Sequence, residues 1–259
     1  MRDPDLGLLE QAARAGGRIA LRHWKRSPRA WDKDDGAGPV SEADLEVNSA
    51  LEALLRTARP DYGWLSEESP DGAARLSAAR VFVLDPIDGT RAFLAGEENF
   101  AISLAVVQGG VPVAGVVFLP ARDRLYAADA GGPATCNGQI IRASDRADET
   151  GASLLATGAT MAPEHWPGGV PDLQRSFRTS LAYRLSLVAE GRHDGMATFR
   201  DAWEWDIAAG ALIAARAGAR VTDRNGHPLA FNAADPRCPG VICAAPGLHA
   251  ALMERRQRA

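Results

Sequence analysis

The sequence predicts an α+β fold in which helices and sheets stack as the layers of a sandwich. With 259 residues, 46% of them hydrophobic and 24% charged, the chain can bury a core as one large domain or as two closely packed ones. Segments with helical and with strand periodicity alternate irregularly, and no internal repeat marks a solenoid or a propeller. Closely spaced apolar runs near the middle of the chain also indicate an antiparallel sheet.

Two helices are predicted in the first 60 residues. Residues 6–24 space their apolar side chains on one helical face, although a pair of glycines lowers the helix propensity in the middle. Residues 41–59 begin with Ser41 and carry Asp44 three residues later, a pattern typical of a helix start. Pro60 ends this second helix, because proline lacks the backbone N–H that a helix interior needs.

Two short apolar runs, at 62–65 and 81–84, are predicted strands, and each leads directly into carboxylates. Glu67 and Glu68 follow the first run, and Asp85 follows the second. We therefore expect these two strands to deliver acids to one edge of a sheet. Three further strands with short turns between them, expected to form an antiparallel meander, are predicted at 102–107, 113–119 and 124–128.

The second half of the chain predicts further strands and helices around a long loop. This loop, 158–172, is rich in glycine and proline. Helices are expected at 181–190 and at 206–217, and Gly218 follows the second of them as a stop signal. Strands are expected at 153–157, 194–199 and 219–222.

The charge balance favours small partners. A formal net charge of −4 leaves no surplus of Lys and Arg for binding a nucleic-acid polymer or an anionic membrane. The first residues are acidic where a signal peptide would be basic, and no apolar run approaches the roughly 18 residues of a membrane span. We therefore expect a cytoplasmic protein with no membrane contact.

The cysteines and histidines leave oxygen as the expected metal ligand. The three cysteines form no CxxC pair, which argues against a disulfide framework or a structural zinc site and predicts reduced, buried thiols. The five histidines are scattered, without HExxH or similar spacing. Any bound metal is therefore expected to be held by oxygen atoms.

One acidic stretch, from Asp85 to Thr90, points to a specific chemistry. A strand of the buried type runs into Asp85 and Asp88, two carboxylates that repel each other unless a cation lies between them. Gly89 permits a tight turn, and Thr90 can start a helix whose first amides point at an anion. Metal and phosphate could then share one place. Mg²⁺ suits it, because Mg²⁺ prefers carboxylate oxygens and completes its shell with substrate phosphate.

A plainer interpretation explains a lone stretch of this kind about equally well: a turn at Asp88 and a helix cap at Asp85. Two distant acids change this balance. Glu67 ends the preceding apolar run, and Asp206 opens a much later helix. Taken singly, Glu67 is typical of a solvated loop acid and Asp206 of an N-cap. Their joint occurrence favours a metal centre.

Two well-spaced motifs carry a resemblance to a known family. One is the stretch from Asp85 to Thr90 with Glu67-Glu68-Ser69 before it, and the other is Trp205-Asp206-Ile207-Ala208-Ala209-Gly210. On these motifs the chain resembles, over nearly its whole length, the inositol monophosphatase superfamily of lithium-sensitive, magnesium-dependent phosphatases. Weaker matches are Pro39-Val40-Ser41-Glu42-Ala43-Asp44, Gly115-Val116-Val117 and Cys136-Asn137-Gly138.

The resemblance implies a layered αβαβα sandwich. We expect two domains, an N-terminal one over residues 1–145 with most metal ligands and a C-terminal one over residues 146–259 with Asp206 and the substrate pocket. The resemblance also implies a small phosphorylated metabolite as substrate and a homodimer as the assembly.

The resemblance further implies two Mg²⁺ ions in each site, with a third, weaker ion on the Glu67 side. Glu67 and Asp85 would bind the first ion, helped by the Ile87 carbonyl. Asp85, Asp88 and Asp206 would bind the second, so that Asp85 bridges the pair.

The same resemblance assigns the catalytic roles. Glu67 and Thr90 would orient the attacking water, with Asp44 as the acceptor behind Thr90. Asp88 and the amides of Gly89 and Thr90 would hold the phosphate. Such a reaction needs no protein nucleophile, because metal ions activate water and align an in-line displacement.

Weaker signals bear on which ester is hydrolysed. Arg91, after the first motif, is similar to a residue of the 3′(2′),5′-bisphosphate nucleotidases or the histidinol-phosphate phosphatases, and Glu204, before the second, is similar to one of the bisphosphate nucleotidases. With Arg184, these two residues are the expected substrate contacts. Arg91 or Arg184 could bind a second phosphate, or each could be a surface arginine. Residues 157–160 depart from the Ser-Arg-Ser-His-like segment of those nucleotidases. A bisphosphate nucleotidase is the first choice, and an inositol monophosphatase or a histidinol-phosphate phosphatase is the alternative.

Aromatic residues in the second half leave two interpretations open. Trp203 and Trp205 stand beside the second motif, where aromatic side chains belong more often to the core than to a substrate pocket. Within the loop 158–172, the sequence allows Met161, His165 and Trp166 either to face the substrate or to cover the core.

Other functional classes fit the sequence less well. A catalytically silent member of the same fold would not need all five metal-site and water-orienting residues, which are present. A dinucleotide-dependent oxidoreductase would show a GxGxxG motif after a strand, and the chain has none. A cysteine-based phosphatase needs a thiol beside a phosphate loop, and no cysteine stands in such a run.

Overall fold

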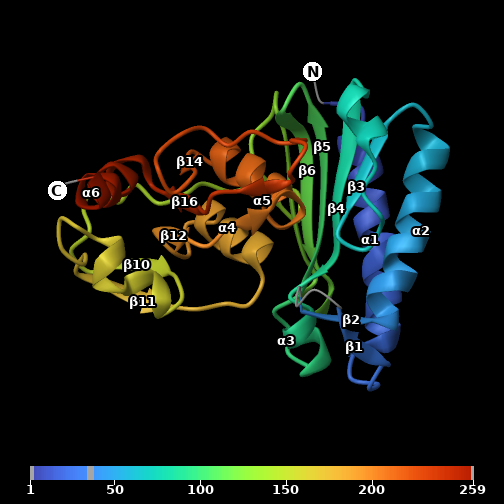
Figure 1. Cartoon of the computed structure of the whole chain (residues 1–259), viewed down its shortest axis with the longest axis horizontal. Helices are drawn as coiled ribbons and strands as arrows, with labels where there is room; N and C mark the ends of the chain where they lie inside the picture. Colours follow the sequence, from blue (N-terminus) through green and yellow to red (C-terminus); the bar gives the residue numbers. More distant parts are fainter. Residues whose placement is uncertain (1–2, 34–37, 258–259) are drawn as a thin grey trace.

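The computed structural model describes residues 3–33 and 38–257, and its elements stack in five layers (Figure 1). Two long helices cover one face of a large sheet, two others lie between that sheet and a smaller one, and a C-terminal helix closes the stack. This order confirms the predicted layered αβαβα sandwich. The helices are α1 (Leu6–His23), α2 (Glu42–Ala58), α3 (Thr90–Leu94), α4 (Leu181–Ala189), α5 (Glu204–Arg216) and α6 (Pro246–Gln257).

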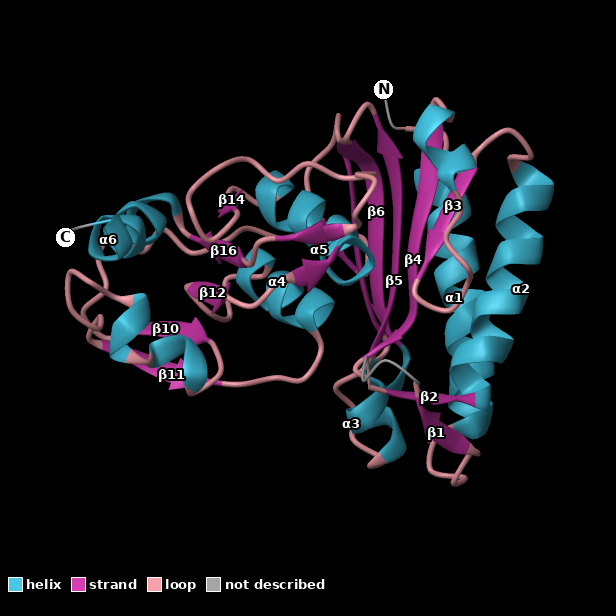
Figure 2. Cartoon of the chain, in the orientation of Figure 1, coloured by secondary structure: helices cyan, strands magenta, loops and turns pink. Residues whose placement is uncertain are grey.

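The large sheet has seven strands in the order β3-β4-β5-β6-β7-β8-β9 (Figure 2). Its first pair, β3 and β4, is parallel, so both strands end at the same edge of the sheet, as the sequence predicts. β5, β6 and β7 form the predicted antiparallel meander. The strands are β3 (Gly63–Ser66), β4 (Arg80–Asp88), β5 (Ala101–Gln108), β6 (Val111–Leu119), β7 (Arg124–Asp129), β8 (Thr135–Cys136) and β9 (Gln139–Ile140).

β4 is longer than the sequence predicts. Its expected end was Leu84, but the strand continues through Pro86 to Asp88, where it still pairs with Ala101 of β5. The register shifts between Asp85 and Asp88, because Pro86 has no N–H to donate to the ladder. The bulge keeps the acidic stretch inside the sheet.

The packing of α1 explains the glycines in its middle. A side chain at Gly17 would bring its Cβ to 2.4 Å from Cε1 of Phe118 on β6, so only glycine permits this close approach. α2 starts with the expected capping box, in which the Ser41 side chain accepts from the Ala43 N–H and the Ser41 N–H donates to Asp44 Oδ2 over 2.9 Å. The two helices predicted in the first 60 residues are therefore confirmed as α1 and α2.

The second sheet has five strands in the order β11-β10-β12-β16-β14. The expected strands near 153, 194 and 219 are present. β16, which lies between β12 and β14 in this sheet, was not predicted, and neither was α6. A short apolar run such as that of β16 shows no alternation when both of its faces are buried. The strands are β10 (Ala152–Leu155), β11 (Leu173–Ser176), β12 (Gly195–Thr198), β14 (Arg220–Thr222) and β16 (Val241–Ala244).

Two small two-stranded sheets complete the described fold. No helix in the described residues combines the length and the apolar character that a bilayer crossing requires. The proposed division into domains at residue 145 stays a prediction, and part of the polar loop that precedes residue 39 lies outside the described residues. The small sheets pair β1 (Ala30–Asp32) with β2 (Pro39–Ser41), and β13 (Ala202–Trp203) with β15 (Arg237–Cys238).

Candidate metal centre and its cavity

Three carboxylates from separate parts of the chain meet at one place. Glu67 follows β3, Asp85 lies in β4, and Asp206 lies in the first turn of α5. One oxygen of each lies within 4.8 Å of one oxygen of the others. The parallel pairing of β3 and β4 sets the first two side by side, and the backbone N–H of Glu67 donates to the Leu84 carbonyl over 3.2 Å.

Burial makes this cluster costly without a cation. Desolvation raises the pKa of Asp85 well above its ordinary value, and the charges of Glu67, Asp88 and Asp206 raise it further. The pKa of Asp206 is raised by the same two effects. Carboxylates packed this closely out of water need a compensating positive charge. A set of hard oxygen donors is what Mg²⁺ prefers, so the residues fit that ion.

Asp88 connects the large sheet to α4. Its Oδ2 accepts hydrogen bonds from Ser180 Oγ over 2.6 Å and from the Ala182 N–H over 2.7 Å, at the start of that helix. Burial raises the pKa of Asp88 to about 6, while these two hydrogen bonds oppose the rise. Because Oδ2 is engaged by α4, its other oxygen is the one left for the cavity that Asp88 lines.

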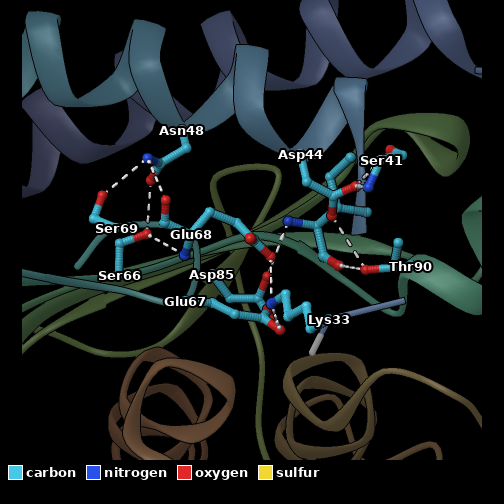
Figure 3. Close-up of polar contacts among 11 residues, drawn as sticks. Lys33, Ser41, Asp44, Asn48, Ser66, Glu67, Glu68, Ser69, Asp85 and Thr90 are labelled. Atoms are coloured by element: carbon cyan, nitrogen blue, oxygen red, sulfur yellow. Dashed lines mark hydrogen bonds and ion pairs between the residues drawn. The ribbon is translucent and has the colours of Figure 1, made fainter. Parts of the chain in front are cut away.

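Thr90 and Asp44 form a pair at the start of α3 (Figure 3). Thr90 Oγ1 lies 3.1 Å from Asp44 Oδ1 and 3.1 Å from the Ile87 carbonyl, so its single proton can go to either acceptor. Asp44 is buried and also accepts from the Ser41 N–H and hydroxyl, and burial raises its pKa to about 6. Gly89 precedes Thr90 with a φ of +100°, a conformation that favours glycine.

A lysine that sequence reasoning missed contacts this centre. Lys33 Nζ lies 2.8 Å from Oε1 of Glu67 and 2.7 Å from Oε1 of Glu68 (Figure 3). Burial lowers the pKa of this ammonium, but the two carboxylates outweigh burial and raise it overall. Burial also raises the pKa of Glu68 to about 7. The scarcity of lysine in the chain was the one sequence signal that could have singled out Lys33.

The carboxylates line a cavity of about 370 Å³ that also carries three arginines, Arg91, Arg184 and Arg200. Arg184 is buried, donates to the Arg178 carbonyl and lies 4.4 Å from the ring centroid of Phe177, and burial lowers its pKa to about 10. Arg91 and Arg200 are exposed. Sequence reasoning named the first two arginines and missed Arg200, which no motif marks.

Glu204 is not among the described residues that line this cavity, and its assignment as a substrate contact stays a prediction. Its buried carboxylate accepts from the Asn232 N–H and from the Ala233 N–H over 2.9 Å. Successive residues of a helix point in different directions, so Glu204 and Asp206 leave the first turn of α5 toward different neighbours. Glu204 therefore fastens the loop at 232–233.

Part of the loop 158–172 lines a second, smaller cavity of about 250 Å³. Thr157 and Arg200 line both cavities, so the two adjoin. His165 faces the smaller cavity, whereas Trp166 is buried and donates from Nε1 to the Thr160 carbonyl over 2.9 Å. Trp166 thus covers the core.

The three cysteines are free and buried, as predicted.

Comparison with known proteins gives consistent matches over the whole chain. The profile described as "Inositol monophosphatase family" matches residues 1–259. The inositol-1-monophosphatase of Rhizobium meliloti is 36% identical over 229 residues, covering 85% of this chain and 83% of that protein. The 3′(2′),5′-bisphosphate nucleotidase CysQ of Escherichia coli K12 is 33% identical over 196 residues, covering 74% of this chain and 79% of that protein.

Solved structures agree with the sequence matches. The extragenic suppressor protein SuhB of Bartonella henselae superposes with a TM-score of 0.83 at 28% identity, covering 99% of this chain and 100% of that one. An IMPase of Thermotoga maritima superposes with a TM-score of 0.84 at 29% identity, covering 97% of this chain and 96% of that one. Relatives with different names thus match about equally well.

Proposed function

The chain belongs to the inositol monophosphatase family of metal-dependent phosphatases, and from this premise we propose that its substrate is a nucleoside 3′(2′),5′-bisphosphate. The observation that carries the proposal is the pairing of carboxylates with three arginines in one cavity. A substrate with a second phosphate needs cationic partners beyond the metal centre, and guanidinium groups bind phosphate through paired hydrogen bonds. Adenosine 3′,5′-bisphosphate would yield AMP and phosphate.

In this proposal the acids of the cavity hold the metal. Glu67, Asp85, Asp88 and Asp206, with the Ile87 carbonyl, are the ligands of two Mg²⁺ ions. Bound Mg²⁺ neutralises phosphate charge and lowers the pKa of water. The fit is supported by the carboxylate oxygens that meet within 4.8 Å and by the raised pKa values, which mark uncompensated negative charge.

The chain's own residues orient the reactants. Thr90 Oγ1, held by Asp44, and the Glu67 carboxylate position a water molecule, and Asp88 with the backbone N–H groups of Gly89 and Thr90 holds the phosphate. The water oxygen forms a bond to phosphorus as the ester P–O bond breaks, and the departing oxygen takes up a proton. The exposed Arg200 and the buried Arg184 line the same cavity, which supports a role for them in binding the second phosphate.

The adjoining cavity supports a bulky leaving group. It is lined by Phe199, Thr157, Thr160 and Thr198, and it shares Arg200 with the metal cavity. Apolar walls with a few hydroxyl groups are typical of pockets for flat organic groups such as a nucleobase. Inositol 1-phosphate and histidinol phosphate lack a second phosphate for these arginines to bind.

A substrate panel tests the proposal. Initial rates are measured on adenosine 3′,5′-bisphosphate, inositol 1-phosphate and histidinol phosphate, with Mg²⁺ and with added Li⁺. We expect the highest kcat/KM on the bisphosphate. A bisphosphate that is no better than a generic phosphomonoester would refute the substrate while leaving the phosphatase in place. Inhibition by Li⁺, a homodimer and a cytoplasmic location stay predictions.

A further inference from the structure

The chain holds a cation of its own against the proposed metal centre. The Lys33 ammonium contacts Glu67 and Glu68 through one oxygen of each, at 2.8 and 2.7 Å (Figure 3). The Lys33 side chain is 18% exposed, and those of Glu67 and Glu68 are 21% and 6% exposed. The ammonium therefore lies between two neighbouring carboxylates that would otherwise repel each other in a partly buried place.

Lysine is a rare residue in this chain. Of its 29 basic residues only Lys25 and Lys33 are lysines, and the rest are arginines. An ammonium is a compact point charge that can approach two carboxylates from a single position, whereas a guanidinium is a broad planar fork. A lysine at this position therefore suits a place with room for a small cation.

Glu68 is fixed by contacts that do not involve the metal centre. Its N–H donates to Ser66 Oγ over 3.3 Å, and its carbonyl accepts from Asn48 Nδ2 over 3.4 Å. Asn48 in turn accepts from Ser66 Oγ over 2.7 Å and donates to Ser69 Oγ over 2.9 Å (Figure 3). Its carboxylate lies outside the group of three that meet within 4.8 Å, so it serves Lys33.

We infer that the Lys33 ammonium fills the outer side of Glu67 as a built-in cation, so that divalent ions bind only on the inner side, toward Asp85 and Asp206. This inference rests on the proposed role of Glu67 as a metal ligand. Lys33 contacts Oε1 of Glu67 and is not among the described residues that line the cavity with Glu67, Asp85 and Asp206. The protein thereby supplies the charge that a third, weaker metal ion would bring, and Lys33 acts as a positioning residue for Glu67.

Metal counting tests the inference without an activity assay. Mn²⁺ is used as the probe because carboxylate sites that suit Mg²⁺ also suit Mn²⁺, and free Mn²⁺ is followed by electron paramagnetic resonance. Lys33→Met empties the outer side of Glu67. We expect it to bind a further Mn²⁺ ion per chain that the wild type does not bind. Lys25→Met, the matched control, should bind as many ions as the wild type.

A double variant separates the new ion from a general gain in negative charge. Lys33→Met combined with Glu68→Gln removes the carboxylate that faces the ammonium, and its ion count should return to that of the wild type. If Lys33→Met does not fold, Lys33→Gln removes the same charge with a polar chain of similar length and is titrated in its place.

Two outcomes would overturn the inference: equal Mn²⁺ counts in the wild type and the Lys33 variant, or an additional ion that persists in the double variant. Failure of the proposed function has a different signature. In that case the wild-type chain would bind no Mn²⁺ or would hydrolyse no phosphate ester with Mg²⁺. If the Lys33 variant bound an additional ion although the protein was inactive, the inference about Lys33 would still hold.

Discussion

Two parts of the cavity wall carry charged side chains that are fixed in different ways. On the wall built by the large sheet, Asp85 lies inside a strand and accepts from the Ile87 N–H over 2.9 Å, so its position follows from the backbone. On the wall built by the second half of the chain, Arg200 reaches the cavity from an exposed position after β12. In the proposed function the rigid acid belongs to the metal centre, and the exposed cation is free to influence which ester is accepted.

The largest effect should come from the rigid wall. Asp85→Asn removes the proposed bridging ligand, and because such metal ions supply several kcal/mol of transition-state stabilisation, we expect kcat/KM to fall by about 10³-fold or more. The same variant removes a desolvated charge, so the metal-free protein should have a raised Tm. Turnover and thermal unfolding are measured on the same preparations. Unchanged activity would disprove the bridging role of Asp85.

The exposed Arg200 should affect which phosphate ester is accepted rather than the rate of the chemical step. Arg200→Ala removes a charge-assisted contact worth about 1.5–3 kcal/mol, so kcat/KM on adenosine 3′,5′-bisphosphate should fall by roughly 10- to 150-fold, mainly through KM. Activity on a simple phosphomonoester should stay close to the wild type. Arg216→Ala is the control, because Arg216 lies in the last turn of α5 and bonds to the Gly132 carbonyl. Equal losses of kcat/KM on both esters would contradict the proposed role of Arg200 in choosing the substrate.

The buried acids near the centre also lead to a prediction of how the stability of the metal-free protein depends on pH. Burial raises the folded-state pKa of Asp44 and Asp88 from 3.8 to about 6, so between these values the folded protein holds more protons than the unfolded chain. Stability should therefore fall as pH rises from about 4 to about 6. Differential scanning calorimetry in EDTA should show this fall, and added Mg²⁺ should reduce it. A Tm that rises over this range in EDTA would contradict the prediction.

The contrast between the walls also explains what the sequence could predict. Glu67 and Asp85 each follow a strand predicted from the sequence, and Asp206 opens a predicted helix, so the local pattern indicates their positions, and the structure brings all three together. Lys33 and Arg200 stand in irregular segments, and their contacts depend on tertiary packing that no periodicity records. The sequence therefore predicts acids better than cations here.

The same reason accounts for the fold. Helices with one apolar face and the strands of the meander were predictable, because one-sided burial leaves a period in the sequence. β16 is buried at all four positions and carries no such period. The course of β4 beyond Leu84 was missed because Pro86 is read locally as a stop, whereas pairing of Asp88 with Ala101 outweighs that signal.

The smallest effect should come from Glu204, which stands two residues from Asp206 and whose carboxylate binds the backbone at Asn232 and Ala233. Glu204→Gln replaces a carboxylate that accepts two backbone N–H groups by an amide that presents one acceptor oxygen and a donor NH₂ group. We expect the free energy of unfolding to fall by about 1–3 kcal/mol, measured in urea. Values of kcat and KM on the bisphosphate should equal those of the wild type, and the exposed Glu97→Gln is the control for charge. A rise in KM specific to Glu204→Gln would instead support the predicted contact of this residue with the substrate.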